Sequence, residues 1–253
     1  MKTIRPWIVL AIVFAAAEAH ASGDLFVDAA NDYAAQRYHD AVDKYEELLL
    51  DGHRHADVFY NLGNAYFRVG KIGRAILNYE RALRMSPGAD DALYNLEVAR
   101  DVAASRFGRD TLAGIETDPL WMRAVNWQPL GTLAWAFLAL DVIFFSVLIA
   151  VRFLPTGFLR TGLVTSQVFI GLAGALVGLL LAGQLYFLRH VKMSVVVADE
   201  VIMREGPDPT RREMPKLHAG HRLVILRESQ GWVRVRLANR VEGWVPKDTV
   251  DVI

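Results

Sequence analysis

The sequence has no cysteine among its 253 residues, which excludes a disulfide framework, a thiolate metal site and a cysteine nucleophile. It has no excess charge of either sign, because 28 lysines and arginines are balanced by 28 aspartates and glutamates. This balance, without a basic stripe interleaved with aromatics, argues against a dedicated nucleic-acid binder. Nucleophile motifs, phosphate-binding glycine loops and the HExxH zinc motif are also missing. We therefore expect a protein that is not an enzyme and uses no cofactor and no metal.

The first 21 residues follow the order of a secretory signal peptide. Lys2 and Arg5 come before an apolar stretch, residues 7–17, that is too short to span a bilayer comfortably. Ala19 and Ala21 then supply small residues at the two positions that a signal peptidase reads. We predict cleavage after Ala21, and the alternative is an uncleaved membrane anchor.

A pattern in the first half of the chain recurs every 34 residues. Tyr60-Asn61-Leu62 returns as Tyr94-Asn95-Leu96, and Tyr45 precedes Tyr79 by the same interval. This period is typical of arrays of helix–turn–helix repeats. Such arrays bind other polypeptides and rarely catalyse reactions, so the pattern favours an adaptor.

Glycine and proline divide this region into five expected helices between about residues 24 and 104. They form a predicted all-α repeat domain over residues 22–105, followed by a linker and interfacial segment over residues 106–130. The central repeat, residues 56–89, has small residues such as Gly63 where two antiparallel helices would meet. The units on either side depart from the pattern, as capping repeats do.

Two long apolar runs follow. Residues 131–151 contain one charge and residues 162–187 contain none, which predicts two transmembrane helices joined by a loop over residues 152–161. The loop carries Arg152 and Arg160 without an acidic residue, so the positive-inside rule places it in the cytoplasm. Both flanking domains then lie outside, as the signal peptide independently predicts. We expect a bacterial inner-membrane protein with both soluble domains in the periplasm.

From residue 188 to residue 253 the hydrophobic period changes to two. Short β-rich runs such as Val233/Val235 alternate with turn residues such as Gly220 and Gly231. We predict a small all-β barrel here. The whole chain then has the fold class of a multidomain membrane protein with an all-α repeat domain, a two-helix transmembrane hairpin and a barrel.

Several of these residues carry a resemblance to known families. The central repeat resembles the tetratricopeptide repeat at Phe59, Leu62, Gly63, Tyr66, Ala75, Tyr79, Ala82 and Pro87. The C-terminal segment is similar to bacterial SH3-like domains over residues 201–207, at Gly220, over residues 231–235 and over residues 243–245. The order of signal, repeats, two spans and SH3-like domain resembles the BatE-type proteins of bacterial aerotolerance operons.

That resemblance implies a non-enzymatic accessory subunit. It would accompany von Willebrand A-domain membrane proteins and an AAA+ ATPase, and its repeats would bind a partner protein. The alternative is a cell-envelope anchoring module whose SH3-like domain binds peptidoglycan or wall peptides. A third hypothesis, a transporter or channel subunit, depends on Asp141 alone.

The candidate partner-binding residues lie on the first helix of each repeat pair, because these helices form the concave face of such arrays. Asparagine can hydrogen-bond a peptide backbone in both directions. Aspartates on this face argue against capture of a terminal carboxylate. The alternative is that Tyr60 and Asn61 only support helix packing. The candidates are Asp57, Tyr60, Asn61, Asn64, Phe67, Tyr94 and Asn95.

Two further groups of residues are candidates. Trp232 and Trp244, with Arg234 nearby, are predicted to line a wall- or peptide-binding groove, unless both tryptophans pack inside the barrel. Asp141 is the only charge within either span, and counting inward from the loop places it beside Gly174. It is either hydrogen-bonded within the hairpin, in contact with a partner, or part of an ion path. The histidine pairs at 53/55 and 218/221 are weak metal signals.

Overall fold

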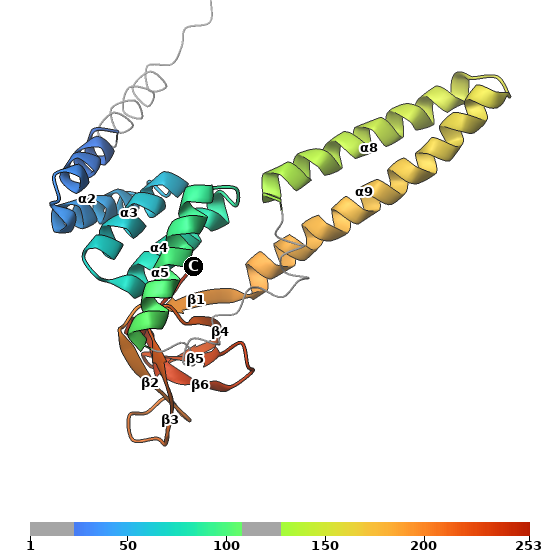
Figure 1. The fold of residues 1–253 in the computed structure, drawn as a ribbon. Helices are drawn as coiled ribbons and strands as arrows, with labels where there is room; N and C mark the ends of the chain where they lie inside the picture. Colours follow the sequence, from blue (N-terminus) through green and yellow to red (C-terminus); the bar gives the residue numbers. More distant parts are fainter. Residues whose placement is uncertain (1–22, 108–127) are drawn as a thin grey trace, which may run out of the picture. The chain divides into compact units, whose positions relative to one another are not determined.

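The computed structural model describes residues 23–107 and 128–253 of the chain. The predicted signal peptide and nearly all of the predicted linker lie outside these residues. The described residues fall into two units (Figure 1). One unit combines the helices of residues 23–107 with the strands that end the chain. The other unit holds the described residues 128–192.

Five helices build the repeat domain, residues 23–107, as the glycine and proline positions predict. Turn residues Gly52 and Gly70 have φ values of 90° and 82°, a left-handed conformation that glycine adopts without strain. The first helix covers residues 23–34, and the others are α2 (Tyr38–Leu50), α3 (Ala56–Arg68), α4 (Ile72–Met85) and α5 (Asp90–Phe107).

Helices α3 and α4 pack closely because Gly63 has no side chain. A Cβ placed on Gly63 would lie only 2.7 Å from Cε1 of Tyr79. Tyr79 is buried in the same continuous core as Tyr45, Leu62 and Ile76. The predicted close approach of two antiparallel helices at Gly63 is therefore present.

Helix α5 runs further than the sequence pattern predicts. The predicted linker begins at Arg106, but α5 continues through Arg106 to Phe107. The Phe107 ring stacks on the ring of His218 from the β domain, with 4.9 Å between centroids and 14° between planes. This contact joins segments that lie far apart in the sequence.

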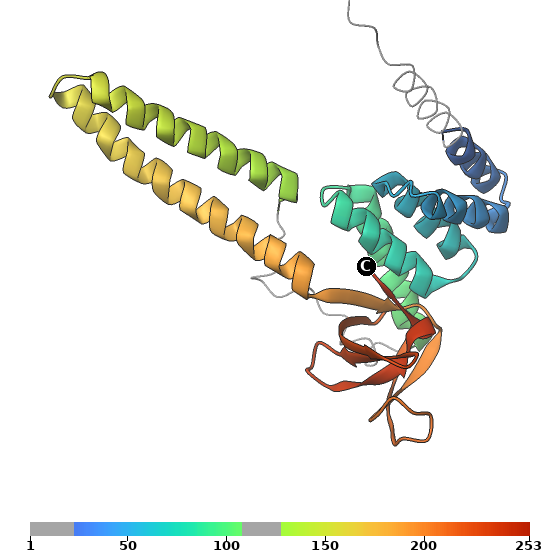
Figure 2. The ribbon, with the colours of Figure 1, turned by 180° about the vertical axis from the view of Figure 1, so that it is seen from behind.

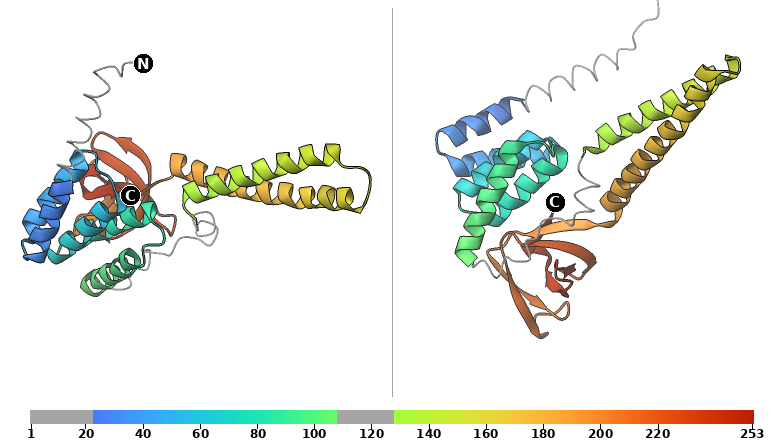
Figure 3. Two further views of the ribbon diagram at one scale, coloured as in Figure 1. Left: turned by 90° about the horizontal axis from the view of Figure 1, so that it is seen from above. Right: turned by 45° about the vertical axis from the view of Figure 1, so that its right-hand side comes forward.

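The second unit is a helical hairpin of α8 (Leu130–Phe153) and α9 (Phe158–His190), which lie side by side in the views of Figures 1 and 3. Both helices are long and apolar enough to cross a membrane. Each helix extends beyond its predicted apolar run. Arg152 and Arg160, which the sequence placed in the loop of residues 152–161, are helical, so the connection shortens to residues 154–157. A Cβ on Gly178 would lie 3.0 Å from the Phe137 ring and one on Gly171 would lie 3.4 Å from the Phe144 ring, so these two glycines of α9 face α8.

The β domain, residues 192–253, begins four residues later than predicted, because α9 continues to His190. Its antiparallel strands form one seven-stranded sheet in the order β3-β2-β6-β5-β4-β1-β7. Figure 2 draws this domain in orange to red. The strands are β1 (Lys192–Val196), β2 (Glu200–Arg204), β3 (Glu213–His218), β4 (Arg222–Ser229), β5 (Trp232–Arg236), β6 (Glu242–Pro246) and β7 (Val250–Val252), with the 3-10 helix η1 (Lys247–Thr249) before β7.

Alternation along the strands separates core from surface. In β5, Val233 and Val235 are buried, while Trp232, Arg234 and Arg236 point outward. The buried valines join a separate core with Met203 and others from β2, β3, β4 and β6. The predicted period of two is thus present in the strand that carries two candidate binding residues.

Candidate functional site

Three residues predicted to bind a partner form one hydrogen-bond network in the repeat domain. The hydroxyl of Tyr79 donates to Oδ1 of Asn64 over 2.8 Å. Nδ2 of Asn95 donates to the same oxygen over 2.9 Å and to the Tyr60 hydroxyl over 3.2 Å. These bonds join α3, α4 and α5, so Tyr60, Asn64 and Asn95 support the packing of the helices that carry the predicted face.

The other predicted partner-binding residues differ in exposure. Asp57 is exposed, and Tyr94 is 67% exposed. Asn61 is half-buried, and Phe67 packs against the repeat core. The part of this face that is open to another molecule therefore includes Asp57 and Tyr94, which we call the repeat face.

Trp232 and Trp244 lie on one outward face of neighbouring strands. In the β5–β6 register, Trp232 pairs with Pro246 and Arg234 pairs with Trp244, so the two tryptophans are diagonal neighbours. Both are half-buried, and neither belongs to the buried core of the β domain. Arg234 forms an ion pair with Glu242 at 2.9 Å on the same face. We call Trp232, Arg234 and Trp244 the tryptophan face.

Comparison with known families identifies both kinds of module. Residues 56–88 match the family model of the tetratricopeptide repeat. Residues 199–251 match the family model of the bacterial SH3 domain. No protein of curated function matches the chain. The first match supports protein–protein interaction by the repeat domain, and the second supports cell-wall binding by the SH3-like domain, residues 192–253.

A buried carboxylate joins these two domains. Glu80 of α4 has a side chain that is only 5% exposed. Its Oε1 accepts a hydrogen bond from Nη2 of Arg100 on α5 over 2.7 Å, and its Oε2 lies 3.1 Å from Nε of Arg222 on β4. The Glu80 carboxylate therefore has a positively charged partner in each of the two domains.

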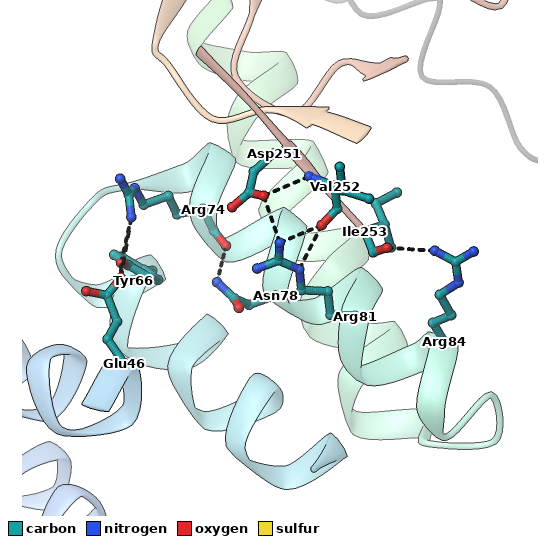
Figure 4. Close-up of polar contacts among 9 residues, drawn as sticks. All are labelled: Glu46, Tyr66, Arg74, Asn78, Arg81, Arg84, Asp251, Val252 and Ile253. Carbon is teal, nitrogen blue, oxygen red and sulfur yellow. Dashed lines mark hydrogen bonds and ion pairs between the residues drawn. The ribbon is translucent and has the colours of Figure 1, made fainter. Parts of the chain in front are cut away.

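Two further arginines of α4 hold the last strand of the SH3-like domain (Figure 4). Nε of Arg81 donates to the main-chain oxygen of Val252 over 3.0 Å, and its Nη2 lies 3.0 Å from Oδ1 of Asp251. Nη1 of Arg84 donates to the main-chain oxygen of Ile253 over 2.6 Å. Burial lowers the pKa of the Arg81 guanidinium, whereas Asp251 raises it. Because β7 is an edge strand, these arginines also cover carbonyls that an edge leaves open.

The main chains of the two domains also touch. A Cβ on Gly73 of α4 would lie 2.7 Å from the main-chain oxygen of Val196 and 3.0 Å from Cβ of Ala219. Val195 of β1 is fully buried within the core of the repeats. We call this contact the seam: Gly73, Glu80, Arg81 and Arg84 on α4, and β1, Arg222 and residues 251–253 of the SH3-like domain.

Our sequence analysis did not find the seam. Its one local signal is Leu77 of α4, which is buried yet lines a cleft beside the β7 residues Val250 and Asp251. Such an apolar residue, together with Gly73, indicates a helix covered on more than one side. Glu80 gave no signal, since a glutamate in a helix is usually solvent-exposed.

Two clefts open along the seam. One, of about 270 Å³, lies between α2, α3, α4 and the residues around β7, and its lining includes Glu46, Tyr66 and Asn78. The other, of about 370 Å³, lies between α2, the α3–α4 turn and the β1–β2 loop. Burial, with a hydrogen bond to Glu46, raises the pKa of Tyr66 to about 12, so its hydroxyl stays protonated at neutral pH.

Asp141 is exposed on the surface of the hairpin. The contacts of Gly171 with Phe144 and of Gly178 with Phe137 bracket the predicted position of Asp141 beside Gly174. Within residues 128–192, as the structure describes them, no side chain forms a hydrogen bond or ion pair with Asp141.

The second histidine pair, His218 and His221, lies within the packed SH3-like domain. His221 is buried, and its Nδ1 lies 3.1 Å from the main-chain nitrogen of His218. Across the two described stretches of the chain, no group of three or more potential metal ligands occurs.

Gly73→Ala tests the seam. Alanine normally stabilises a helix relative to glycine by about 1 kcal/mol. At Gly73 we expect the opposite sign, a loss of about 1–3 kcal/mol in the free energy of unfolding, because the new methyl group meets the Val196 carbonyl. Denaturant unfolding of the full chain in detergent measures the change.

Gly88→Ala is the matched control, since a Cβ there meets no atom within 4 Å. It should leave the unfolding free energy unchanged or raise it. Equal effects of the two substitutions would contradict a close backbone contact at Gly73.

Proposed function

We propose that this chain is a non-enzymatic inner-membrane adaptor whose tetratricopeptide repeats bind a partner protein. The observation that carries the proposal is the match of residues 56–88 to a protein-binding repeat, combined with an exposed repeat face supported from beneath by the Tyr60–Asn64–Asn95 network. Exposed Tyr94 has the side chain type that dominates many protein interfaces.

The proposed topology places both soluble domains in the periplasm and the connecting loop in the cytoplasm. The sequence of residues 1–21, the two apolar helices and the arginines at 152 and 160 all support this arrangement. A hairpin returns the chain to the side from which it entered. The repeat and SH3-like domains, which share the seam, then lie in the same compartment.

The proposed partners are membrane-complex subunits. The domain order resembles the BatE-type proteins of aerotolerance operons, which implies a complex with von Willebrand A-domain proteins and an AAA+ ATPase. The exposed position of Asp141 supports assembly within the membrane, because a carboxyl group in the bilayer is costly unless another group hydrogen-bonds it. A neighbouring membrane helix would supply that group.

Affinity capture from gently solubilised membranes tests the adaptor. Asp57→Arg combined with Tyr94→Ala changes the exposed repeat face without touching the network that holds the helices. We expect partner recovery to fall roughly tenfold or more, since losing one aromatic anchor costs on the order of 1–2 kcal/mol.

The matched control is Asp43→Arg combined with Leu50→Ala, a change of the same type at exposed positions of α2. It should recover the partner as the wild type does. Equal recovery by all three proteins, each folded by circular dichroism, would contradict partner binding through the repeat face.

The second candidate function is anchoring to the cell wall through the SH3-like domain. The shared outward face of Trp232 and Trp244 favours it. The full chain in nanodiscs should then co-sediment with purified peptidoglycan. Trp232→Ala with Trp244→Ala should weaken this binding roughly tenfold, because stacking surfaces are lost, while Leu226→Ala at an exposed β4 position should not. Undiminished sedimentation of the double variant would exclude the tryptophan face.

A further inference from the structure

The two clefts along the seam lie next to each other, and we call them together the groove. They share the lining residues Tyr66, Arg74, Val197 and Asp248. Helices α2, α3 and α4 supply one wall, and the β1–β2 loop with η1 supplies the other. The groove therefore exists only where the repeat and SH3-like domains meet, and it includes no residue of the repeat face or the tryptophan face.

The unpaired charges of this groove have opposite signs on opposite walls. Lys71 lies on the repeat wall, and Asp199 and Asp248 lie on the wall of the SH3-like domain. Across residues 23–107 and 128–253, no side chain forms an ion pair with any of these three. By contrast, Arg74 is engaged by Glu46 at 3.4 Å and by the Tyr66 hydroxyl at 3.0 Å.

The groove also contains a buried hydrogen-bond acceptor without a donor. Asn78 is 2% exposed, and its Nδ2 donates to the main-chain oxygen of Arg74 over 2.8 Å (Figure 4). Its Oδ1 has no hydrogen-bond partner among the described residues. A buried amide oxygen left in this way is costly, and native proteins nearly always satisfy it. A bound molecule with an N–H group would do so.

We propose that the groove binds a short peptide that carries both an ammonium group and a carboxylate. The carboxylate would pair with Lys71, the ammonium group with Asp199 or Asp248, and a peptide N–H would donate to Oδ1 of Asn78. The apolar lining from Val42, Val69 and Val197 suits small aliphatic side chains. Free peptides and the peptides attached to the wall polymer share this chemistry.

Calorimetric titration of the full chain in nanodiscs with the tripeptide Ala-Gly-Ala tests the proposal. We expect saturable binding that weakens about tenfold when the amino terminus is acetylated, and similarly when the carboxyl terminus is amidated, because each cap removes a charge-assisted contact. No saturation up to several millimolar, or equal binding of the doubly capped peptide, would overturn the proposal.

Variants assign the two ends of the ligand. Lys71→Ala should weaken binding about three- to tenfold and abolish the difference between the free and amidated carboxyl termini. Asp199→Asn combined with Asp248→Asn should instead abolish the difference between the free and acetylated amino termini. The matched controls Lys216→Ala and Asp101→Asn lie outside the groove and should preserve both differences. Unchanged discrimination in both groove variants would refute the assignment.

Wall sedimentation distinguishes the two sources of peptide. If Lys71→Ala lowers both tripeptide binding and co-sedimentation with purified peptidoglycan, the ligand is a peptide of the wall polymer. If it lowers tripeptide binding alone, the ligand is a free peptide. The Asp57/Tyr94 variant should keep normal tripeptide affinity, so failure of the adaptor hypothesis and failure of this proposal are separable.

Discussion

The unit formed by the repeat and SH3-like domains depends on one buried carboxylate. Glu80 is buried, and its carboxylate lies beside one arginine from each domain, Arg100 of α5 and Arg222 of β4. Moving the domains apart would break the buried ion pair between Glu80 and Arg222, and breaking a buried ion pair costs several kcal/mol. The arginine contacts to β7 and the backbone contact at Gly73 also hold the two domains together, because each of them forms only when the domains are in contact.

The seam changes what the two modules can do together. A tetratricopeptide repeat and an SH3-like domain on a flexible linker would sample many relative positions, and their ligands would bind independently. Here α4 holds both domains, so the repeat face and the tryptophan face keep a fixed geometry. Two linked ligands can engage both faces together only at a matching separation. The groove along the seam is a direct product of this arrangement.

Patterns local in sequence predicted most of the separate parts. The 34-residue period predicted the helices and the approach of Gly63 to Tyr79, apolar length predicted α8 and α9, and alternation predicted the outward position of Arg234. Local patterns did not predict the features that depend on contacts between residues distant in the chain. Phe107 at the end of α5 stacks on His218, and Asn64 turns inward, where Tyr79 and Asn95 both donate to it. A buried Glu80 cannot be recognised until Arg222 is known to be its neighbour.

Native-state hydrogen exchange on the full chain in nanodiscs tests most directly whether Glu80 joins the two domains. Glu80→Ala should lower the opening free energy of α4, α5, β4 and β7 together, by about 3 kcal/mol or more. Glu46→Ala, one repeat earlier and at a partly exposed position, should leave β4 and β7 unchanged. If Glu80→Ala reduces protection in α4 and α5 while β4 and β7 keep wild-type protection, the two domains are independent and the account is wrong.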